Sequence, residues 1–329
     1  MPASAPSGQS TFDGKPITPL RRLRYLLHAG LLFGFLGLFR MLPLDTASAL
    51  GGWVGRRVLA PFAGNRRALA NIRLAFPDIG DDEANRIAAG MWDNLGRLIA
   101  EFAHLDAFVG DPEGRIVIHG LENARRILAS GKGILAIPGH FANWEVMSVA
   151  VRNIGIEGHI VLRPPNNPYV VDWLSRLRDR TGLRGQIVKG AEGTRQIFTR
   201  LRRGEMVSIM MDQALAEGIP IDFFSRPAMT NPLPATLALR MDLNLVPISI
   251  RRTAGAHFEM TIHPPMEVRH SGDMQADVAE LTARINHFVE DVVRAAPEQW
   301  LWIHNRWGSH GNLTRRGRAV AGMARESAE

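Results

Sequence analysis

The chain of 329 residues contains no cysteine. That absence excludes disulfide frameworks, thiolate zinc sites, cysteine nucleophiles and iron–sulfur clusters, so any catalysis must use oxygen or nitrogen groups. Charged residues are also few, at 22%, and aromatic residues make up 7%, whereas hydrophobic residues reach 46%. This balance is typical of a folded globular chain. At this length one large domain or two small ones can bury a full core.

Lysine is scarce as well. Lys15, Lys132 and Lys189 are the only lysines among 39 basic residues, and the formal net charge is +7. Arginine therefore carries the positive charge. Because the arginine guanidinium holds phosphate and carboxylate groups through a planar fork, this surplus favours an anionic partner such as a nucleic acid, an acidic protein or a phosphorylated membrane.

Residues 1–20 are rich in proline, serine and glycine, which predicts a disordered lead-in. For residues 21–45 we predict a membrane-anchoring helix, because arginines precede the apolar run Tyr25–Phe39 and such a helix prefers lipid to water. The run of fifteen residues is shorter than the roughly 20 that cross a bilayer core. Spanning and shallow insertion both remain open, and we favour anchoring in one leaflet on the cytoplasmic side.

A secretory signal peptide is the alternative interpretation of this region. Ala47-Ser48-Ala49 has the small-x-small form of a cleavage site and follows an apolar run. Arg40 and Asp45 argue against cleavage, because they place charges between the apolar run and that site.

Residues 46–312 are predicted to form one α/β domain with a helical lead-in at 46–110, followed by a loose tail at 313–329. In the lead-in we expect a helix from Asp82 to about Phe108. Short β-prone runs then alternate with helical stretches, which predicts a largely parallel central sheet flanked by helices. The expected strands are Arg115–Ile118, Ile134–Ile137, His159–Leu162, Met206–Met211, Leu245–Ile250 and His257–Ile262, and the expected helices are 122–130, 143–153, 168–181, 191–203, 232–242 and 274–295.

The segment Gly133–Glu145 carries the strongest local signal. A buried strand runs into Pro-Gly and then His140, and residues just past the carboxyl end of such a strand face the crevice where ligands bind. With His140 on the loop and Glu145 in the first turns of the next helix, a carboxylate–imidazole hydrogen bond becomes possible. It would fix the tautomer and let the other ring nitrogen take a proton from a hydroxyl.

Two other interpretations of His140 stay open. A zinc-ligand pair is disfavoured, because the sequence has neither H-E-x-x-H nor a thiolate, and no metal is predicted. Alternatively, His140 has a structural role and the Glu145 carboxylate only interacts favourably with the helix dipole. Of these two interpretations, the spacing of the residues alone favours the structural one.

The segment GHFANWE at 139–145 resembles the GHFGNWE-type H-x4-E motif of the bacterial lipid A biosynthesis acyltransferases, which add late acyl chains and belong to the lysophospholipid acyltransferase superfamily. Five further segments resemble blocks of that family in the same order, so the resemblance spans about residues 20–310. They are Leu162–Pro168 (RPxxNP), Arg180–Gly182 (RxG), Gly204–Gln213, Phe223–Ala228 (FFGxPA) and Pro297–Trp307 (PEQYLWxHRR).

The chain departs from the family pattern at several positions. Ala142 replaces the usual glycine, Ser225 stands where the FFG block has glycine, and Asn305 stands where arginine is common. The stretch 229–234 also differs. None of these changes removes His140 or Glu145, so they bear on the identity of the substrate rather than on the reaction.

The resemblance implies an O-acyltransferase at the cytoplasmic face of the bacterial inner membrane. It would pass an acyl group from an acyl carrier protein thioester to a hydroxyl of a lipid A precursor, with His140 as general base and Glu145 as the residue that orients it. No cofactor is implied. Because the chain has no cysteine and no serine in a G-x-S-x-G turn, we expect direct transfer through a ternary complex.

Further residues are candidates for substrate contacts. Arg163, just after an apolar strand, could hold a phosphate or the phosphopantetheine arm, or pair with a neighbouring carboxylate. Asn167 could touch substrate while also capping the next helix. Asp212 ends a buried strand and reaches the same crevice, where it could instead hold Arg163 or a loop.

Two candidates concern the oxyanion and the C-terminal block. Arg306 is a further candidate for a substrate contact, and it lies in a tryptophan-rich segment that suits either a membrane interface or core packing. Backbone N–H groups between Gly139 and Asn143, at the helix start, are the natural donors to a tetrahedral oxyanion.

The arginine surplus would then serve an acidic carrier protein, the phosphates of the lipid A precursor and anionic membrane lipids. A nucleic-acid partner is not expected, because the sequence has no helix-turn-helix, zinc finger or RNA-binding aromatic motif. Two alternative functions remain: an acyltransferase of the same fold acting on another lysophospholipid or glycolipid, and a non-catalytic membrane scaffold that binds lipid.

Overall fold

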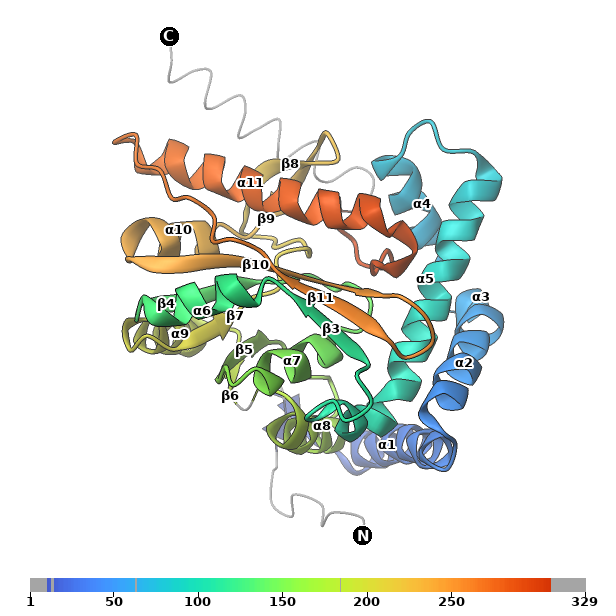
Figure 1. Ribbon diagram of the computed structural model, residues 1–329. Coiled ribbons are helices and arrows are strands. Elements are labelled where there is room, and N and C mark those ends of the chain that lie inside the picture. The colour runs from blue at the N-terminus through green and yellow to red at the C-terminus, as the bar shows by residue number, and fades with distance from the viewer. Residues whose placement is uncertain (1–10, 13–14, 63, 184, 309–329) are drawn as a thin grey trace.

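A computed structural model describes residues 11–12, 15–62, 64–183 and 185–308. Its centre is a seven-stranded sheet in the order β3-β11-β10-β4-β7-β5-β6 (Figure 1). Neighbouring strands pair in parallel except β10 and β11, so β3 and β11 run opposite to the other five. The predicted α/β class with a largely parallel sheet is confirmed. The strands are β3 (Ile116–His119), β4 (Gly133–Ile137), β5 (Gly158–Leu162), β6 (Gly185–Val188), β7 (Met206–Ser208), β10 (Leu243–Arg252) and β11 (Phe258–Ile262).

Helices cover both faces of the sheet. All five residues of β4 are buried, which explains the unbroken apolar run GILAI. Ile134 and Ala136 join the core formed with α7 and α8, whereas Leu135 and Ile137 join the core formed with α9, α10 and the first half of α11. These helices are α6 (Leu121–Ala129), α7 (Trp144–Asn153), α8 (Pro168–Thr181), α9 (Ala191–Arg202), α10 (Leu233–Arg240) and α11 (Met274–Ala295).

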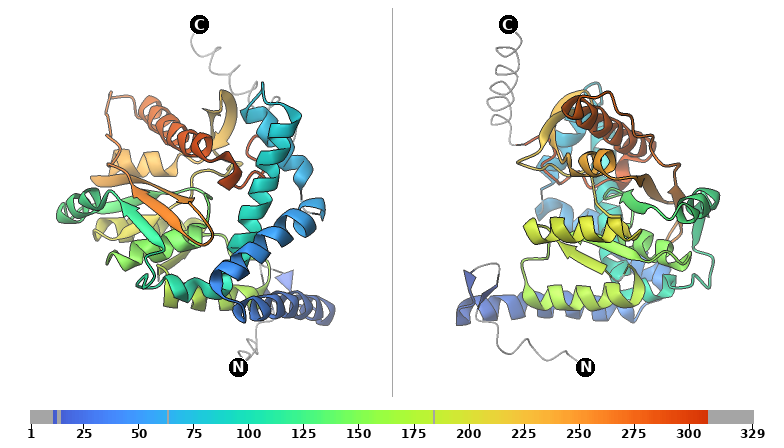
Figure 2. Two further views of the ribbon diagram at one scale, coloured as in Figure 1. Left: turned by 45° about the vertical axis from the view of Figure 1, so that its right-hand side comes forward. Right: turned by 90° about the vertical axis from the view of Figure 1, so that its left-hand side faces the viewer.

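The lead-in is helical and stands at one side of the sheet, with α5 as an upright column (Figure 2). It comprises α2 (Leu44–Val54), a short π-helix (Gly55–Leu59), α3 (Ala60–Phe62), α4 (Asn65–Ala75), α5 (Asp81–Glu101) and a 3-10 helix (Phe102–Phe108). Acidic side chains fill the first turn of α5, as its dipole favours. A Cβ on Gly96 would lie 2.1 Å from the Gly51 carbonyl oxygen, so α2 and α5 approach backbone to backbone.

Helix α1 (Pro19–Arg40) is capped by Thr18. It begins two residues before the predicted anchoring segment 21–45 and ends at Arg40, short of residue 45. It lies across the lower end of α5, next to α8 (Figures 1 and 2). One stripe is buried against the body, at Tyr25, Ala29, Leu36 and Phe39, while several leucines on other faces are exposed. Among the described residues it is the one helix long and apolar enough to cross a membrane. The predicted tail, 313–329, lies outside the described residues.

The six expected strands and six expected helices beyond residue 115 are all present, with shifted ends. Beyond residue 115, three strands were not predicted. They are β6 at the sheet edge and the two strands of a hairpin that forms a separate sheet, β8 (Ile219–Phe223) and β9 (Arg226–Thr230). The hairpin is short, half exposed and carries Pro220 and Pro227, so it lacks the apolar run that marks a buried strand. Two more strands that were not predicted, β1 (Thr11–Phe12) and β2 (Lys15–Pro16), pair within residues 1–20.

Candidate active site

The loop that carries His140 leaves the carboxyl end of β4. The parallel register pairs Ala136 of β4 with Ser208 of β7, and the Met211 amide continues the ladder to the Pro138 carbonyl at 3.2 Å. Four residues further along each of the two segments, Asp212 comes to lie opposite His140. The crevice position expected for both residues is therefore what the strand pairing produces.

Asp212 holds His140 at two points. One carboxylate oxygen lies 2.8 Å from His140 Nδ1, and the other accepts the His140 backbone N–H at 2.8 Å. Trp300 Nε1 donates to the second oxygen, also at 2.8 Å. Burial by itself raises the pKa of Asp212, but the His140 ring and these three donors outweigh it, so the pKa lies well below its usual range.

An ionised Asp212 makes His140 Nδ1 the proton donor of that pair, which leaves the lone pair on Nε2. Gln213 places its amide nitrogen 3.3 Å from Nε2, and the Trp144 ring packs edge-on against the imidazole with centroids 5.0 Å apart. The His140 side chain is 18% exposed. A partly accessible Nε2 lone pair can accept a proton from a hydroxyl.

His304 lies close to this pair. Its Nε2 accepts the Ala214 amide at 3.2 Å, and burial lowers the pKa of the His304 ring. A neutral His304 beside the site adds no positive charge to compete with His140 for Asp212.

The expected hydrogen bond between His140 and Glu145 is wrong. Glu145 is the second residue of α7, is 5% exposed, and pairs instead with Arg178 of α8, whose Nε lies 3.0 Å from one carboxylate oxygen. Its side chain leaves α7 towards α8, whereas the His140 ring faces the end of β7. Asp212 thus occupies the orienting position that the spacing suggested for Glu145.

The side chain of Asn143 is the N-cap of α7. Its side-chain oxygen accepts the amides of Glu145 at 3.1 Å and Val146 at 3.2 Å, and its Nδ2 donates to Glu101. The amides of His140 and Ala142 are also engaged, by Asp212 and by the Gln299 carbonyl. Of the predicted oxyanion donors between Gly139 and Asn143, the amides of His140 and Ala142 are therefore already engaged by other groups.

Both glycine replacements noted in the sequence fall at left-handed backbone. Ala142 has φ of 43° and Ser225 has φ of 56°. Glycine adopts this region freely and other residues only under strain. The conformation explains why glycine is usual at these positions.

Arg163 and Asn167 follow β5, two strands from β4. Arg163 is exposed, and within the described ranges no hydrogen bond or ion pair engages its guanidinium. Asn167 caps α8 through the Tyr169 amide at 3.0 Å, which confirms its predicted capping role, and its Nδ2 donates to the Tyr25 carbonyl of α1 at 2.9 Å. Asn167 thereby ties α1 to the body.

Arg306, predicted to contact substrate, is fully buried inside the protein. It donates to the Met229 carbonyl, to Thr230 and to Asn286, and its guanidinium lies over the Phe223 ring with 4.7 Å to the centroid. Burial lowers its pKa to about 10. Trp300 and Trp302 are buried too, and core packing therefore accounts for this segment better than a membrane interface.

Several site residues escaped the sequence reading. Trp300, Gln213 and His304 lie in segments recognised as family blocks, but nothing in their spacing shows that they meet at His140. Arg178 lies in no such block. Within the described residues no group of three or more histidine or carboxylate side chains could hold a metal ion.

A cavity of about 360 Å³ lies on the other side of this loop, between α11 and the strands β10 and β11. Its wall is mostly apolar and includes Phe141, the residue after His140, together with Ile250, Phe288 and Val292. Polar and charged side chains also line it: Ser249 and His263, hydrogen-bonded to each other at 2.9 Å, and Arg251, Glu259, Thr261, Asp291 and Gln299.

Comparison with known proteins identifies the family of the chain. The family model described as bacterial lipid A biosynthesis acyltransferase matches residues 17–309. The chain is 29% identical to the lipid A biosynthesis lauroyltransferase of Escherichia coli (strain K12) over 313 residues, which cover 88% of this chain and 94% of that protein.

Two further relatives give the same family. The lipid A biosynthesis palmitoleoyltransferase of Escherichia coli (strain K12) is 26% identical over 286 residues, covering 83% of this chain and 89% of the relative. A lipid A biosynthesis acyltransferase of Haemophilus influenzae (strain ATCC 51907 / DSM 11121 / KW20 / Rd) is 26% identical over 267 residues, covering 77% and 78%. The chain belongs to the bacterial lipid A biosynthesis acyltransferases.

Proposed function

We propose that this protein transfers a fatty acyl chain from an acyl carrier protein thioester to a hydroxyl of a lipid A precursor. The observation that carries the proposal is the His140–Asp212 pair at the carboxyl end of the sheet, in a chain of this family. The acceptor class follows the names of the relatives. The carrier-protein donor rests on the resemblance of the motifs.

In the proposed reaction the acceptor hydroxyl replaces Gln213 at His140 Nε2 and loses its proton there. The oxygen forms a bond to the thioester carbonyl carbon, the carbon–sulfur bond breaks, and the departing sulfur takes the proton from Nε2 as a thiol. Asp212 keeps Nδ1 protonated and stabilises the imidazolium that forms between the two proton transfers.

Arg163 is the proposed phosphate contact. The strands β4, β7 and β5 are neighbours and parallel, so His140, Asp212 and Arg163 follow three adjacent carboxyl ends. Two strand spacings put the guanidinium's strand about 10 Å from that of His140. This span suits a phosphate of the acceptor or of the phosphopantetheine arm beside the reacting atoms.

Glu145 is proposed as a positioning residue. Its pair with Arg178 joins the first turn of α7 to α8. Helix α7 begins at Trp144, directly after the loop that bears His140. This pair would therefore limit movement of the loop.

For the membrane we propose anchoring by α1 in one leaflet at the cytoplasmic face of the inner membrane. One stripe of α1 is packed on the body and Arg40 is paired with Asp106 at 2.7 Å, while Leu20, Leu23 and Leu31 are exposed. A helix docked along its length presents its free side to lipid without leaving the body. Anionic lipids and the acidic carrier protein would meet the arginines around it.

We propose that the cavity beside Phe141 receives the acyl chain, because most of its wall area is apolar and the wall begins one residue from His140. Replacing Ala295 in that wall with phenylalanine is expected to shift the preferred donor towards shorter chains. An unchanged preference in a folded Ala295→Phe variant would remove the cavity from the account.

Mass spectrometry tests the function. A lipid A precursor is incubated with the purified protein, with a panel of acyl-carrier thioesters, and in parallel with the His140→Ala variant. The expected result is a mass gain of one acyl chain that the variant loses. No gain from folded, membrane-bound protein would favour another lysophospholipid or glycolipid acceptor, and failure with those as well would favour a non-catalytic scaffold.

A further inference from the structure

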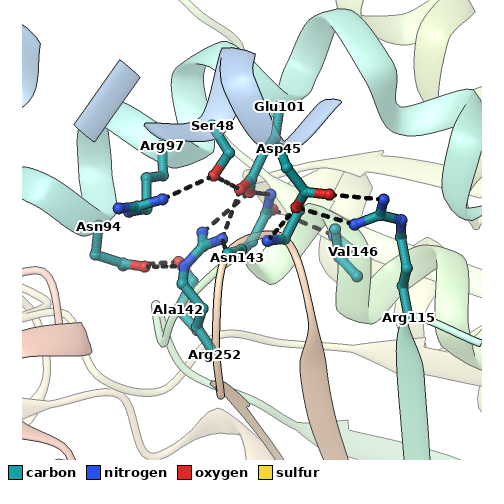
Figure 3. A network of polar contacts seen from close by, with 12 residues as sticks. Asp45, Ser48, Asn94, Arg97, Glu101, Arg115, Ala142, Asn143, Val146 and Arg252 are labelled. Carbon is teal, nitrogen blue, oxygen red and sulfur yellow. Dashed lines mark hydrogen bonds and ion pairs between the residues drawn. The ribbon is translucent and has the colours of Figure 1, made fainter. Parts of the chain in front are cut away.

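We propose that Glu101 and Arg252 form a positioning pair that holds the His140 loop in its active shape, an inference that rests on the proposed function. Glu101 ends α5 in the helical lead-in, and Arg252 ends β10 in the sheet. Arg252 Nη1 lies 2.5 Å from one carboxylate oxygen and Nη2 lies 3.0 Å from the other (Figure 3). Glu101 is fully buried and the Arg252 side chain is 8% exposed.

Glu101 reaches the loop through Asn143. The Asn143 Nδ2 donates to the carboxylate at 2.7 Å, and Ser48 of α2 donates to the other oxygen at 2.6 Å. With its nitrogen turned to Glu101, Asn143 must point its oxygen at the first amides of α7. The carboxylate thereby fixes the cap of the helix that follows His140.

Arg252 reaches the same loop by two routes that end on Ala142. Its Nε donates to Asn94, whose Nδ2 donates to the Ala142 carbonyl at 3.0 Å. Its backbone exchanges two hydrogen bonds with the Gln299 side chain, at 2.7 and 3.0 Å, and the Gln299 carbonyl accepts the Ala142 amide at 2.8 Å. Both polar backbone atoms of Ala142 are therefore held by partners of Arg252.

The loop needs such restraint because Ala142 is left-handed, with φ of 43°. A strained residue of this kind persists only where the surroundings over-determine it. His140 lies two residues before Ala142, and its contacts with Asp212 depend on where the loop leaves β4. Relaxation at Ala142 would thus misplace the general base.

A buried ion pair is weak evidence for stability, because desolvation offsets the attraction between the charges. Its value here is geometric, since it joins α5, β10 and the loop. The pair of Asp45 with Arg115 offers a contrast: it also links the lead-in to the sheet, but its contacts with Arg115 and the Ala256 amide do not touch the loop (Figure 3).

The test compares Glu101→Gln and Asn143→Ser with the matched control Asp45→Asn in the full-length protein. Asn143→Ser keeps a capping oxygen and leaves Glu101 paired with Arg252, so it breaks only the link to the loop. Both test variants are expected to lower kcat by roughly 10- to 100-fold with KM within about twofold. Amide hydrogen exchange at residues 140–146 is expected to quicken in both and to stay unchanged in Asp45→Asn.

Unchanged kcat and exchange in Asn143→Ser would overturn the proposal even if Glu101→Gln fails to fold. Equal losses of kcat in Asp45→Asn would overturn it too, because they would show a general loss of structure. If the wild-type protein transfers no acyl chain, the proposed function fails, and the exchange measurement alone decides whether the pair restrains the loop.

Discussion

Two buried carboxylates lie near His140, and they serve different partners. Glu145 is five residues from His140 in the chain yet pairs with Arg178. Asp212 is 72 residues away and contacts both the ring and the backbone of His140. Strand register therefore decides which carboxylate orients the imidazole, whereas closeness in sequence does not.

The largest expected effect is the loss of the imidazole itself. His140→Ala should lower the rate of acyl transfer by roughly 10²- to 10⁴-fold, because a positioned general base contributes that much. His159, a half-buried histidine paired with Glu205 at 2.7 Å, is the matched control. Steady-state rates near wild type for His140→Ala, or an equal loss in His159→Ala, would contradict the assignment.

Asp212→Asn should lower kcat by roughly 10²-fold or more. The asparagine oxygen would still accept the His140 amide and Trp300, so its nitrogen would face Nδ1 and impose the tautomer that lacks a lone pair on Nε2. Steady-state rates near wild type for a folded Asp212→Asn variant would separate Asp212 from the base.

Glu145→Gln should act mainly on the fold. Both partners of the ion pair are largely buried, so removing one charge is expected to cost about 3–5 kcal/mol of unfolding free energy. We expect lower kcat, because α7 directly follows the loop that bears His140, but a smaller loss than in Asp212→Asn. In denaturant titrations Glu145→Leu with Arg178→Met should recover most of the stability; a larger loss of kcat in Glu145→Gln than in Asp212→Asn would reverse the comparison.

The smallest effect concerns a histidine without a carboxylate partner. His263 accepts or donates a hydrogen bond with Ser249, and burial lowers its pKa. The unfolded chain then binds the proton more tightly, so stability should fall as pH drops below about 6.5 towards the lowered folded-state pKa. His263→Asn should flatten this slope in thermal unfolding between pH 7.5 and 5.5, and an unchanged slope would exclude His263 as its source.

Most of the fold was readable from the chain. The buried strands of the parallel sheet are unbroken apolar runs, and helices such as Pro168–Thr181 have caps that the sequence displays. The hairpin β8–β9 was missed because it is half exposed and lies outside the main sheet. Strands buried on both faces can be recognised in the sequence as continuous apolar runs, and strands at an edge cannot.

The site was readable only in part. The motif and the strand end placed His140 and Asp212 at one edge of the sheet, but their direct contact depends on the register of β4 against β7, which one sequence does not display. For the segment of Arg306 the sequence left a membrane interface and core packing open, and the structure buries the guanidinium among carbonyl and hydroxyl groups. Because the partners of this buried arginine are neutral, no acidic residue in the sequence indicates that its side chain is buried.

Nitrogen-15 NMR of the histidine rings tests the central comparison without any substrate. The resonance of His140, assigned by its loss in His140→Ala, should show a hydrogen-bonded Nδ1–H in the wild type and in Glu145→Gln, and should lose it in Asp212→Asn. Retention of that proton in Asp212→Asn together with its loss in Glu145→Gln would contradict the account and return the orienting role to Glu145.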